Sequence, residues 1–221
     1  MASPEARGRA VFEGTHSMNL TPFAETLARF KAGELVALLD RPEREGEADI
    51  LLAAEHVTPE KLNFMAREVC GLITFALDAG RLRELGIPLL KPAHQIANMP
   101  RFAEPVDYVH GTTTGVSLFD RAATIRAMLD PASRPEDFAR PGHVFPLAAA
   151  EGGLAEREGH TEGAVMLARL AGLQPAVVMC ELLAPDGHMA VGADLREWLA
   201  RHEIALVDIP LIQEAERQSR R

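Results

Sequence analysis

The stretch "REGHTEGAVMLARLAGLQPAVVMCELL", residues 157–183, joins an amphipathic segment directly to a continuous apolar run. The first part, "GAVMLARLAGL", carries apolar residues at helical spacing, and Gly172 near its end is a typical helix stop. The second part, residues 175–183, has the length and apolar character of a buried strand. A helix that leads directly into a buried strand is typical of a layered α/β or α+β domain.

The same alternation extends on both sides of this stretch. Phe23, Leu27 and Phe30 recur at helical spacing within residues 21–34, and Thr21 is a suitable N-cap before Pro22. We expect further strands at residues 35–39, 50–54, 71–77, 144–150 and 204–209, and further helices at residues 59–67, 79–86, 113–130 and 192–203. Residues 91–110 are rich in proline and have little periodicity, so they predict irregular structure. This pattern indicates helices on the faces of a mixed sheet.

Length and composition indicate one domain. The chain has 221 residues, of which 47% are hydrophobic, which is enough for one well-buried core. Residues 1–20 are polar and lack a sustained period, so we expect a flexible leader there and a single domain over residues 21–221. The last segment, "IPLIQEAERQSRR", leaves no room for a second enzyme domain. We therefore expect the chain to act alone or as a homo-oligomer.

Charge and cysteine content exclude several classes of protein. The net charge is −9, and lysine and arginine are scattered, which does not favour nucleic-acid binding. The opening "MASPEARGRAVFEGTHSMNL" has no apolar core of signal-peptide length, and no later segment has about 18 uninterrupted apolar residues, so neither secretion nor membrane spanning is expected. Cys70 and Cys180 are far apart and have no CxxC spacing, which is typical of a reduced, cytoplasmic protein.

An acidic loop separates the first two expected strands. Residues 40–49, "DRPEREGEAD", hold five carboxylates around two arginines. Hard divalent ions such as Mg²⁺ prefer oxygen ligands of this type, and sugar hydroxyls are a further possible guest. The alternative interpretation is a solvated surface turn. Because the loop lies between two apolar strands, at the end of a sheet, a binding site is a reasonable hypothesis.

The polar stretch at residues 157–162 begins the quoted segment. If a helix starts at Gly159–Thr161, its first backbone N–H groups form an anion pocket, with Arg157 adding a guanidinium and Thr161 a hydroxyl. His160 has a side chain suited to a metal ion, and Glu162 suits the positive end of the helix dipole. The alternative is an ordinary helix start with a hydrogen-bonded histidine.

Two further residues lie at expected strand ends. His143 follows a Pro-Gly turn and precedes an apolar strand, which allows either a general base or a hydrogen-bonded structural residue. Glu181 directly follows a buried apolar run, where a carboxylate is costly unless it has partners, and such residues are common in catalytic sites.

Taken together, four segments resemble one family. They are "REGEAD" with the preceding Asp40, "GTTTGVSLFDRAATI", "RPGHVFPL", and "REGHTE" followed by "CELLAPDGHMA". They resemble, in order and over about residues 21–209, the 3,4-dihydroxy-2-butanone 4-phosphate synthases of riboflavin biosynthesis. The resemblance implies a three-layer α-β-α sandwich and a lyase that converts D-ribulose 5-phosphate to 3,4-dihydroxy-2-butanone 4-phosphate and formate. It also implies a Mg²⁺ or Mn²⁺ cofactor, and a homodimer with its sites near the subunit interface.

The resemblance also assigns site residues to this chain. It implies Glu45 and His160 as metal ligands, and His143, Glu181 and Asp40 as catalytic residues. The substrate-binding residues that it implies are Arg44, Glu45, Asp49, Arg157, Glu158, Gly159, His160, Thr161 and Glu181.

Several positions depart from the family pattern. Arg41 and Pro42 replace acidic residues, while Gly46 and Ala48 replace asparagine and glycine, which changes the charge and flexibility of the acidic loop. Glu158 replaces a glycine and is expected to place an anion beside the phosphate site unless it points away. The segment before "GTTTG" lacks the threonines usual in the family. These changes motivate two alternatives: a divergent paralogue acting on another phosphosugar, and a catalytically inactive phosphosugar-binding protein.

Overall fold

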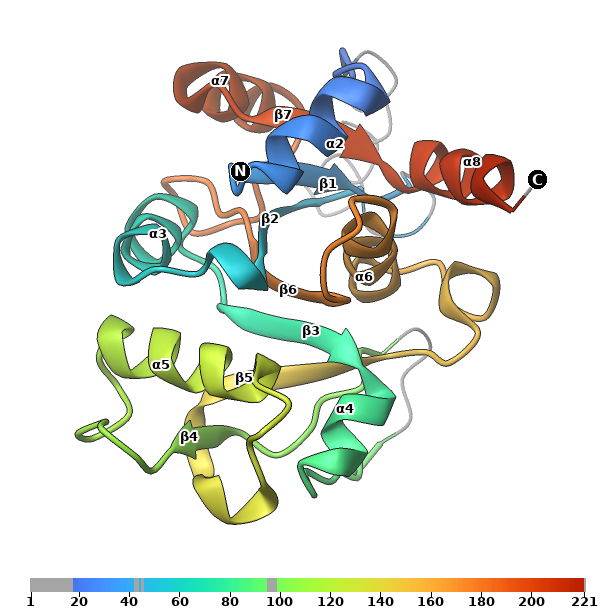
Figure 1. Ribbon diagram of the computed structural model, residues 1–221. Coiled ribbons are helices and arrows are strands. Elements are labelled where there is room, and N and C mark those ends of the chain that lie inside the picture. The colour runs from blue at the N-terminus through green and yellow to red at the C-terminus, as the bar shows by residue number, and fades with distance from the viewer. Residues whose placement is uncertain (1–17, 42–43, 45, 95–98, 221) are drawn as a thin grey trace.

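The structure, a computed structural model, describes residues 18–41, 44, 46–94 and 99–220 (Figure 1). Its helices are α2 (Phe23–Lys31), α3 (Pro59–Phe64), α4 (Ala79–Glu84), α5 (Leu118–Leu129), α6 (His160–Leu170), α7 (Gly192–His202) and α8 (Ile209–Ser219). Its strands are β1 (Val36–Leu39), β2 (Ala48–Ala53), β3 (Thr74–Asp78), β4 (Val106–Tyr108), β5 (Phe138–Ala149), β6 (Ala176–Glu181) and β7 (Ala205–Asp208). Short helical turns lie at Ala54–His56, Met65–Val69, Pro135–Asp137 and Gly153–Ala155.

The strands form one mixed sheet in the order β4-β5-β3-β6-β2-β1-β7. The β3–β5 and β1–β7 pairs are parallel, and the other neighbouring pairs are antiparallel. The inner strands β1 and β2 are buried at every position, which explains why residues 36–39 and 50–53 are continuous apolar runs rather than alternating ones.

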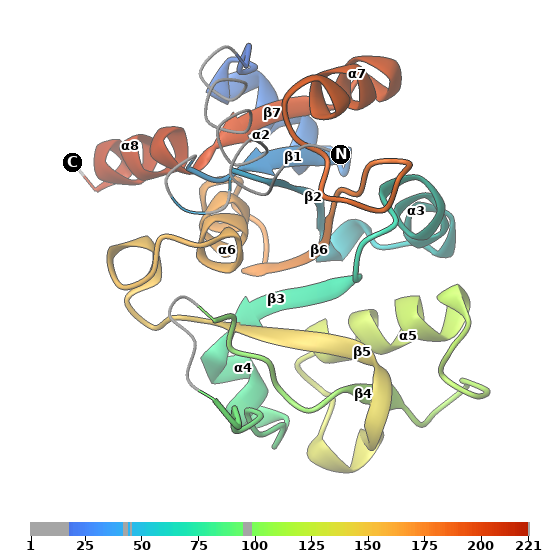
Figure 2. The ribbon, with the colours of Figure 1, turned by 180° about the vertical axis from the view of Figure 1, so that it is seen from behind.

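Helices cover both faces of this sheet (Figures 1 and 2). Alternate strand residues divide between two apolar clusters because successive side chains of a strand point to opposite faces. Leu51 and Met179 join α2, α6 and α8 on one face, whereas Ile50 and Cys180 join α3, α4, α5 and α7 on the other. The predicted α/β fold with three layers is therefore confirmed.

Local signals in the sequence begin several of the helices. The hydroxyl of Ser117 accepts from the N–H of Asp120 at 3.0 Å and begins α5, and Thr58 begins α3 in the same way through Lys61. Each cap satisfies one of the N–H groups that a helix start leaves without a partner in the helix. α6 begins at His160, as the sequence predicts, with Gly159 as its N-cap residue.

Two elements differ from the expectation. β5 begins at Phe138, six residues before the strand expected at residues 144–150, because its first half pairs with β4. β4 itself lies in the segment predicted to be irregular, since a three-residue strand produces no measurable period. The sequence analysis also did not anticipate α8, which Asp208 caps by accepting from the N–H of Leu211 at 2.9 Å.

Of the flexible leader expected at residues 1–20, the structure describes only residues 18–20. Of the expected leader, residues 1–17 lie outside the described residues, while Met18 and Leu20 pack against the core. The N–H of Thr21 donates to the carbonyl of Leu206 at 2.8 Å, so the chain is attached to β7 at this point. The domain boundary at residue 20 stays a prediction. None of the helices that the structure describes has the length and apolar character needed to cross a membrane.

Candidate functional site

A cavity of about 240 Å³ lies at the N-terminal end of α6, on the face of the sheet that α6 covers. It collects polar groups from β2, β6, the acidic loop and the turn before α6. Its lining residues are Arg44, Glu47, Asp49, Thr74, Pro100, Phe102, Leu147, Arg157, His160, Thr161, Met179 and Glu181. Six predicted site residues thus meet at one cavity: Arg44, Asp49, Arg157, His160, Thr161 and Glu181.

Sheet register brings the two strand carboxylates together. Asp49 at the start of β2 is the direct partner of Glu181 at the end of β6. Because paired residues of neighbouring strands point to the same face, both side chains lie on the cavity side of the sheet. Two positions separated by 132 residues therefore become neighbours.

Asp40 holds one of the cavity arginines. Its carboxylate is fully buried, forms an ion pair with Arg44 and accepts from the N–H of Arg41 at 2.7 Å. Asp40 is not among the lining residues, whereas Arg44 is. The ion pair with Asp40 therefore holds the guanidinium of Arg44 in position at the cavity, although Asp40 does not line it.

His160 is the first residue of α6 and is 7% exposed. Its Nε2 lies 3.3 Å from the carbonyl oxygen of Glu47, and its Nδ1 lies 3.9 Å from Oδ1 of Asp49. An imidazole surrounded by oxygen atoms suits a divalent cation. Among the described residues, however, no three His, Cys, Asp or Glu side chains form a ready metal site, and Glu45, the other predicted ligand, lies outside the described residues.

Arg157 is held by Glu162, a carboxylate predicted only to complement the helix dipole. Nη1 of Arg157 donates to Oε2 of Glu162 at 2.5 Å, and the N–H of Ala150 donates to Oε1 at 2.9 Å. Glu162 is 2% exposed. A Cβ on Gly159 would lie 2.1 Å from Nη1 of Arg157, so Gly159 provides the space in which this ion pair packs against the helix start.

Glu181 is fixed by the turn that precedes β3. The N–H of Leu72 donates to Oε2 of Glu181 at 3.1 Å. A Cβ on Gly71 would meet the backbone carbonyl oxygen of Glu181 at 2.1 Å, so no larger residue fits this position without moving the strand. The turn therefore sets both the backbone and the carboxylate of Glu181.

Apart from Glu47, which belongs to the acidic loop, the remaining lining residues carry no signal that identifies them in advance. Thr74 and Met179 pair across β3 and β6, and Leu147 comes from β5. Pro100 and Phe102 come from the segment for which no element was predicted. Apolar wall residues look like ordinary core residues in the sequence, and only the register of the sheet places them at the site.

Four of the predicted site residues that the structure describes do not line the cavity: Asp40, His143, Glu158 and Gly159. Gly159 supports Arg157, as described above. His143 lies farther along β5 and contacts Asp107, its Nδ1 being 2.7 Å from Oδ2. Glu158 faces away, forming an ion pair with Arg41 at 3.3 Å, so the expected anion beside the phosphate site is absent from the described lining.

The altered acidic loop also causes no strain where the structure describes it. Ala48 begins β2 and is not among the described non-glycine residues with positive φ, whereas Gly46 adopts a φ of 66°. A glycine at position 46 therefore suits the left-handed conformation of the loop.

The threonines of "GTTTGVS" support a turn rather than the cavity. Asp120, which is 6% exposed, accepts from the hydroxyl of Thr113 at 2.7 Å and from the N–H of Gly115 at 3.1 Å. The hydrogen bond from Thr113 is the main reason why the pKa of Asp120 is lowered, because it stabilises the carboxylate. This turn packs beside Asp107.

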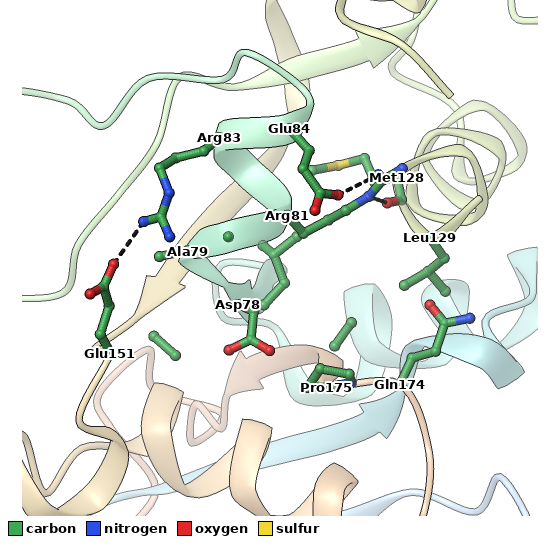
Figure 3. A pocket seen from close by; sticks show the side chains of 14 residues that line it. Asp78, Ala79, Arg81, Arg83, Glu84, Met128, Leu129, Glu151, Gln174 and Pro175 are labelled. Carbon is green, nitrogen blue, oxygen red and sulfur yellow. Dashed lines mark hydrogen bonds and ion pairs between the residues drawn. The ribbon is translucent and has the colours of Figure 1, made fainter. Parts of the chain in front are cut away.

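A larger cavity of about 460 Å³ lies at the other end of β3 (Figure 3). It contains none of the predicted site residues, and its charged residues have ion-pair partners: Arg83 contacts Glu151 at 2.8 Å and Arg81 contacts Glu84 at 2.9 Å, while Asp78 contacts Arg169 outside the lining. Size alone therefore does not identify the functional cavity.

The fold and the smaller cavity together define an α/β protein with a small, charged binding site at a helix N-terminus. The family model for 3,4-dihydroxy-2-butanone 4-phosphate synthase matches residues 24–215. The chain belongs to this family.

Individual relatives agree with this assignment. The chain is 45% identical over 187 residues to the riboflavin biosynthesis protein RibBA of Aquifex aeolicus, covering 84% of this chain and 46% of that protein. It is 42% identical to the 3,4-dihydroxy-2-butanone 4-phosphate synthase of Agrobacterium fabrum, covering 87% of this chain and 90% of that one. The first curated relatives are longer, and the chain spans about half their length. A crystal structure of a 3,4-dihydroxy-2-butanone 4-phosphate synthase in complex with two magnesium ions matches with a TM-score of 0.84 and 35% identity, covering 90% of this chain and 99% of that one.

Proposed function

We propose that the chain converts D-ribulose 5-phosphate to 3,4-dihydroxy-2-butanone 4-phosphate and formate in riboflavin biosynthesis. The observation that carries this proposal is the meeting of two arginines, His160 and the Asp49–Glu181 carboxylate pair at one cavity, in a chain that belongs to the family over most of its length. The features that motivated a divergent paralogue give it no support, because Glu158 faces away from the cavity and Ala48 is unstrained.

The phosphate end of the substrate would bind at the start of α6. The N–H groups of its first turn point out of the helix end, where the helix dipole favours an anion. Arg157 and the hydroxyl of Thr161 border the same space. Glu162 already orients Arg157, and Asp40 already orients Arg44. The two arginine side chains should therefore lose little conformational entropy when the substrate binds.

A divalent cation, Mg²⁺ or Mn²⁺, would be held by His160 together with Glu45. The fit rests on the surroundings of His160, whose ring nitrogens lie close to the Glu47 carbonyl and the Asp49 carboxylate. When bound, such a cation polarises sugar oxygens and makes neighbouring C–H groups more acidic. Glu181, fixed by the N–H of Leu72, is placed to hold or release a proton, and His143 is the second proton-transfer group.

We also propose that the enzyme is a homodimer that works in the cytoplasm. Val109, Val116 and Phe119, on either side of Gly115, are large apolar residues with 45%, 48% and 69% exposure, which a second subunit would cover. Cys70 and Cys180 are both free, which suits a reducing compartment. Light scattering after gel filtration measures the mass, and a monomer at micromolar concentration would contradict the dimer.

Detection of formate tests the activity. The protein is incubated with D-ribulose 5-phosphate and either Mg²⁺ or Mn²⁺, and we expect formate in both cases and none with excess EDTA. Absence of formate at high enzyme concentration would refute the proposed reaction.

Replacement of His160 tests the cation site. His160→Ala should abolish turnover and binding of Mn²⁺, measured by electron paramagnetic resonance, while the circular dichroism spectrum is retained. The control is His94→Ala, an exposed residue outside the cavity lining, which should keep both properties. Equal Mn²⁺ affinity in the two variants would argue against His160 as a ligand.

A further inference from the structure

His143 and Asp107 form a two-point contact between β5 and β4. The backbone N–H of His143 donates to Oδ1 of Asp107 at 2.8 Å, and Nδ1 of the imidazole lies 2.7 Å from Oδ2. The side chain of Asp107 is 15% exposed and that of His143 is 42% exposed. One carboxylate therefore fixes both the backbone and the ring of His143.

Gly115 leaves room for the carboxylate of Asp107, and Gly142 leaves room for the backbone that carries it. A Cβ on Gly115 would lie 2.0 Å from Oδ2 of Asp107, and a Cβ on Gly142 would lie 2.3 Å from the backbone nitrogen of Asp107. The ladder between β4 and β5 also shifts its register between Val106 and Asp107. Two close glycines and a register shift therefore meet at Asp107, a residue that the sequence analysis did not single out.

The position of His143 connects this pair with the proposed site. Thr74 of β3 pairs with Phe145 on one side and with Met179 on the other. Phe145, Thr74 and Met179 therefore form one row across β5, β3 and β6. His143 lies two residues from Phe145, and Glu181 lies two residues from Met179, both towards the same end of the sheet. Two strand spacings separate β5 from β6, which is about 10 Å.

We infer that Asp107 is a positioning residue for His143 in the proposed reaction, on whose assignment this inference rests. With Nδ1–H donating to the carboxylate, the neutral ring keeps its lone pair on Nε2, which becomes the only nitrogen able to accept a proton. When Nε2 takes a proton from the substrate, the ring becomes an imidazolium with both N–H groups, and the Asp107 carboxylate balances its charge. Return of that proton from Nε2 restores the neutral tautomer, so no proton is gained or lost by Asp107.

The variant Asp107→Asn tests this inference. The amide keeps the shape and can still accept from the N–H of His143, but its NH₂ group would face Nδ1 and favour the opposite tautomer. We expect kcat to fall by about 10²–10⁴-fold, the range in which general acid–base groups contribute, with little change in KM. In ¹⁵N NMR spectra of the neutral ring, His143 should carry its proton on Nδ1 in the wild type and on Nε2 in the variant.

A matched control exists in the same chain. Asp186 accepts from the N–H of His188 at 3.0 Å and lies 3.1 Å from its Nδ1, which is the same contact pattern at an exposed turn outside the cavity lining. Asp186→Asn should therefore leave kcat and KM unchanged. A His143→Gln variant identifies the NMR signals of His143.

The outcomes separate this inference from the proposed function. Full turnover by Asp107→Asn beside an active wild type would overturn the inference alone, as would a wild-type His143 that carries its proton on Nε2. A wild type that forms no formate would overturn the proposed function and the inference with it. The NMR measurement of the His143 tautomer uses the wild-type protein. The inference can therefore be refuted even if the Asp107→Asn variant folds poorly.

Discussion

The ion pair between Arg157 and Glu162 should stabilise the protein and order the cavity at the same time. The side chain of Glu162 is 1% exposed and that of Arg157 is 15% exposed, so solvent screens their attraction only weakly. Glu162→Ala removes the partner of a buried guanidinium and the acceptor of the Ala150 N–H, which is expected to cost about 3–5 kcal/mol. Glu162→Gln keeps an acceptor for Ala150 and should cost about 1–3 kcal/mol.

Chemical denaturation with a double-mutant cycle measures this contribution. Arg157→Ala, Glu162→Ala and the double variant are unfolded in urea at pH 7, and we expect a coupling energy of about 1–3 kcal/mol. In thermal unfolding, each kcal/mol corresponds to about 2–4 °C for a domain of this size. Glu162→Gln should also raise KM for the phosphosugar, because the guanidinium that borders the cavity is no longer held.

An exposed pair of the same chemistry provides the control. Arg83 and Glu151 lie 2.8 Å apart but are 67% and 70% exposed, so their coupling should be about 0–1 kcal/mol. If the two cycles give equal coupling energies, burial does not strengthen the Arg157–Glu162 contact and the reasoning is refuted.

Three further predictions concern other parts of the chain. Gly71→Ala should destabilise the fold by about 1–3 kcal/mol and reduce kcat, because its Cβ would collide with the Glu181 carbonyl; urea unfolding and formate release that match the wild type would contradict this. The folded state lowers the pKa of Asp120, so its contribution is present above the unfolded pKa and is lost as pH falls through the lower folded pKa. Asp120→Asn should therefore lower the melting temperature more at pH 7 than at pH 3, and an equal loss at both values would refute this. Burial raises the pKa of the Cys180 thiol, so a thiol reagent at pH 8 should modify only Cys70 in the native protein and both cysteines in guanidinium chloride; rapid native modification of Cys180 would contradict its burial.

Much of the fold was predictable because its elements have long and regular patterns. The helix at His160–Leu170 and the strand at Ala176–Glu181 follow from periodicity and from the glycines and charged residues at their ends. The short strand β4 and the first half of β5 were not predictable, because each exists only through pairing with the other. Their structure depends on contacts between segments that lie 30 or more residues apart.

The candidate site divides in the same way. Charge at expected loop, helix and strand ends indicated the acidic loop, His160 and Glu181, and the family resemblance singled out Arg44 and Asp49; these four residues meet at one cavity. The function of Asp40 and Glu162 as supports for arginines was not predictable, since it requires knowledge of which side chain faces which. Asp107 was missed for the same reason, because its partner is set by the β4–β5 register.

Gln213 on α8 uses both ends of its amide, since its oxygen accepts from Arg41 and its NH₂ group donates to Glu158, each at 2.9 Å. This neutral side chain thereby connects the loop that carries Arg44 to the turn that carries Arg157, and Gln213 itself is not among the residues that line the cavity. Because Gln213 lies on α8, we expect a displacement of this helix to disturb both the loop that carries Arg44 and the turn that carries Arg157. For the proposed phosphosugar site, we therefore expect ligand affinity to fall when α8 is displaced.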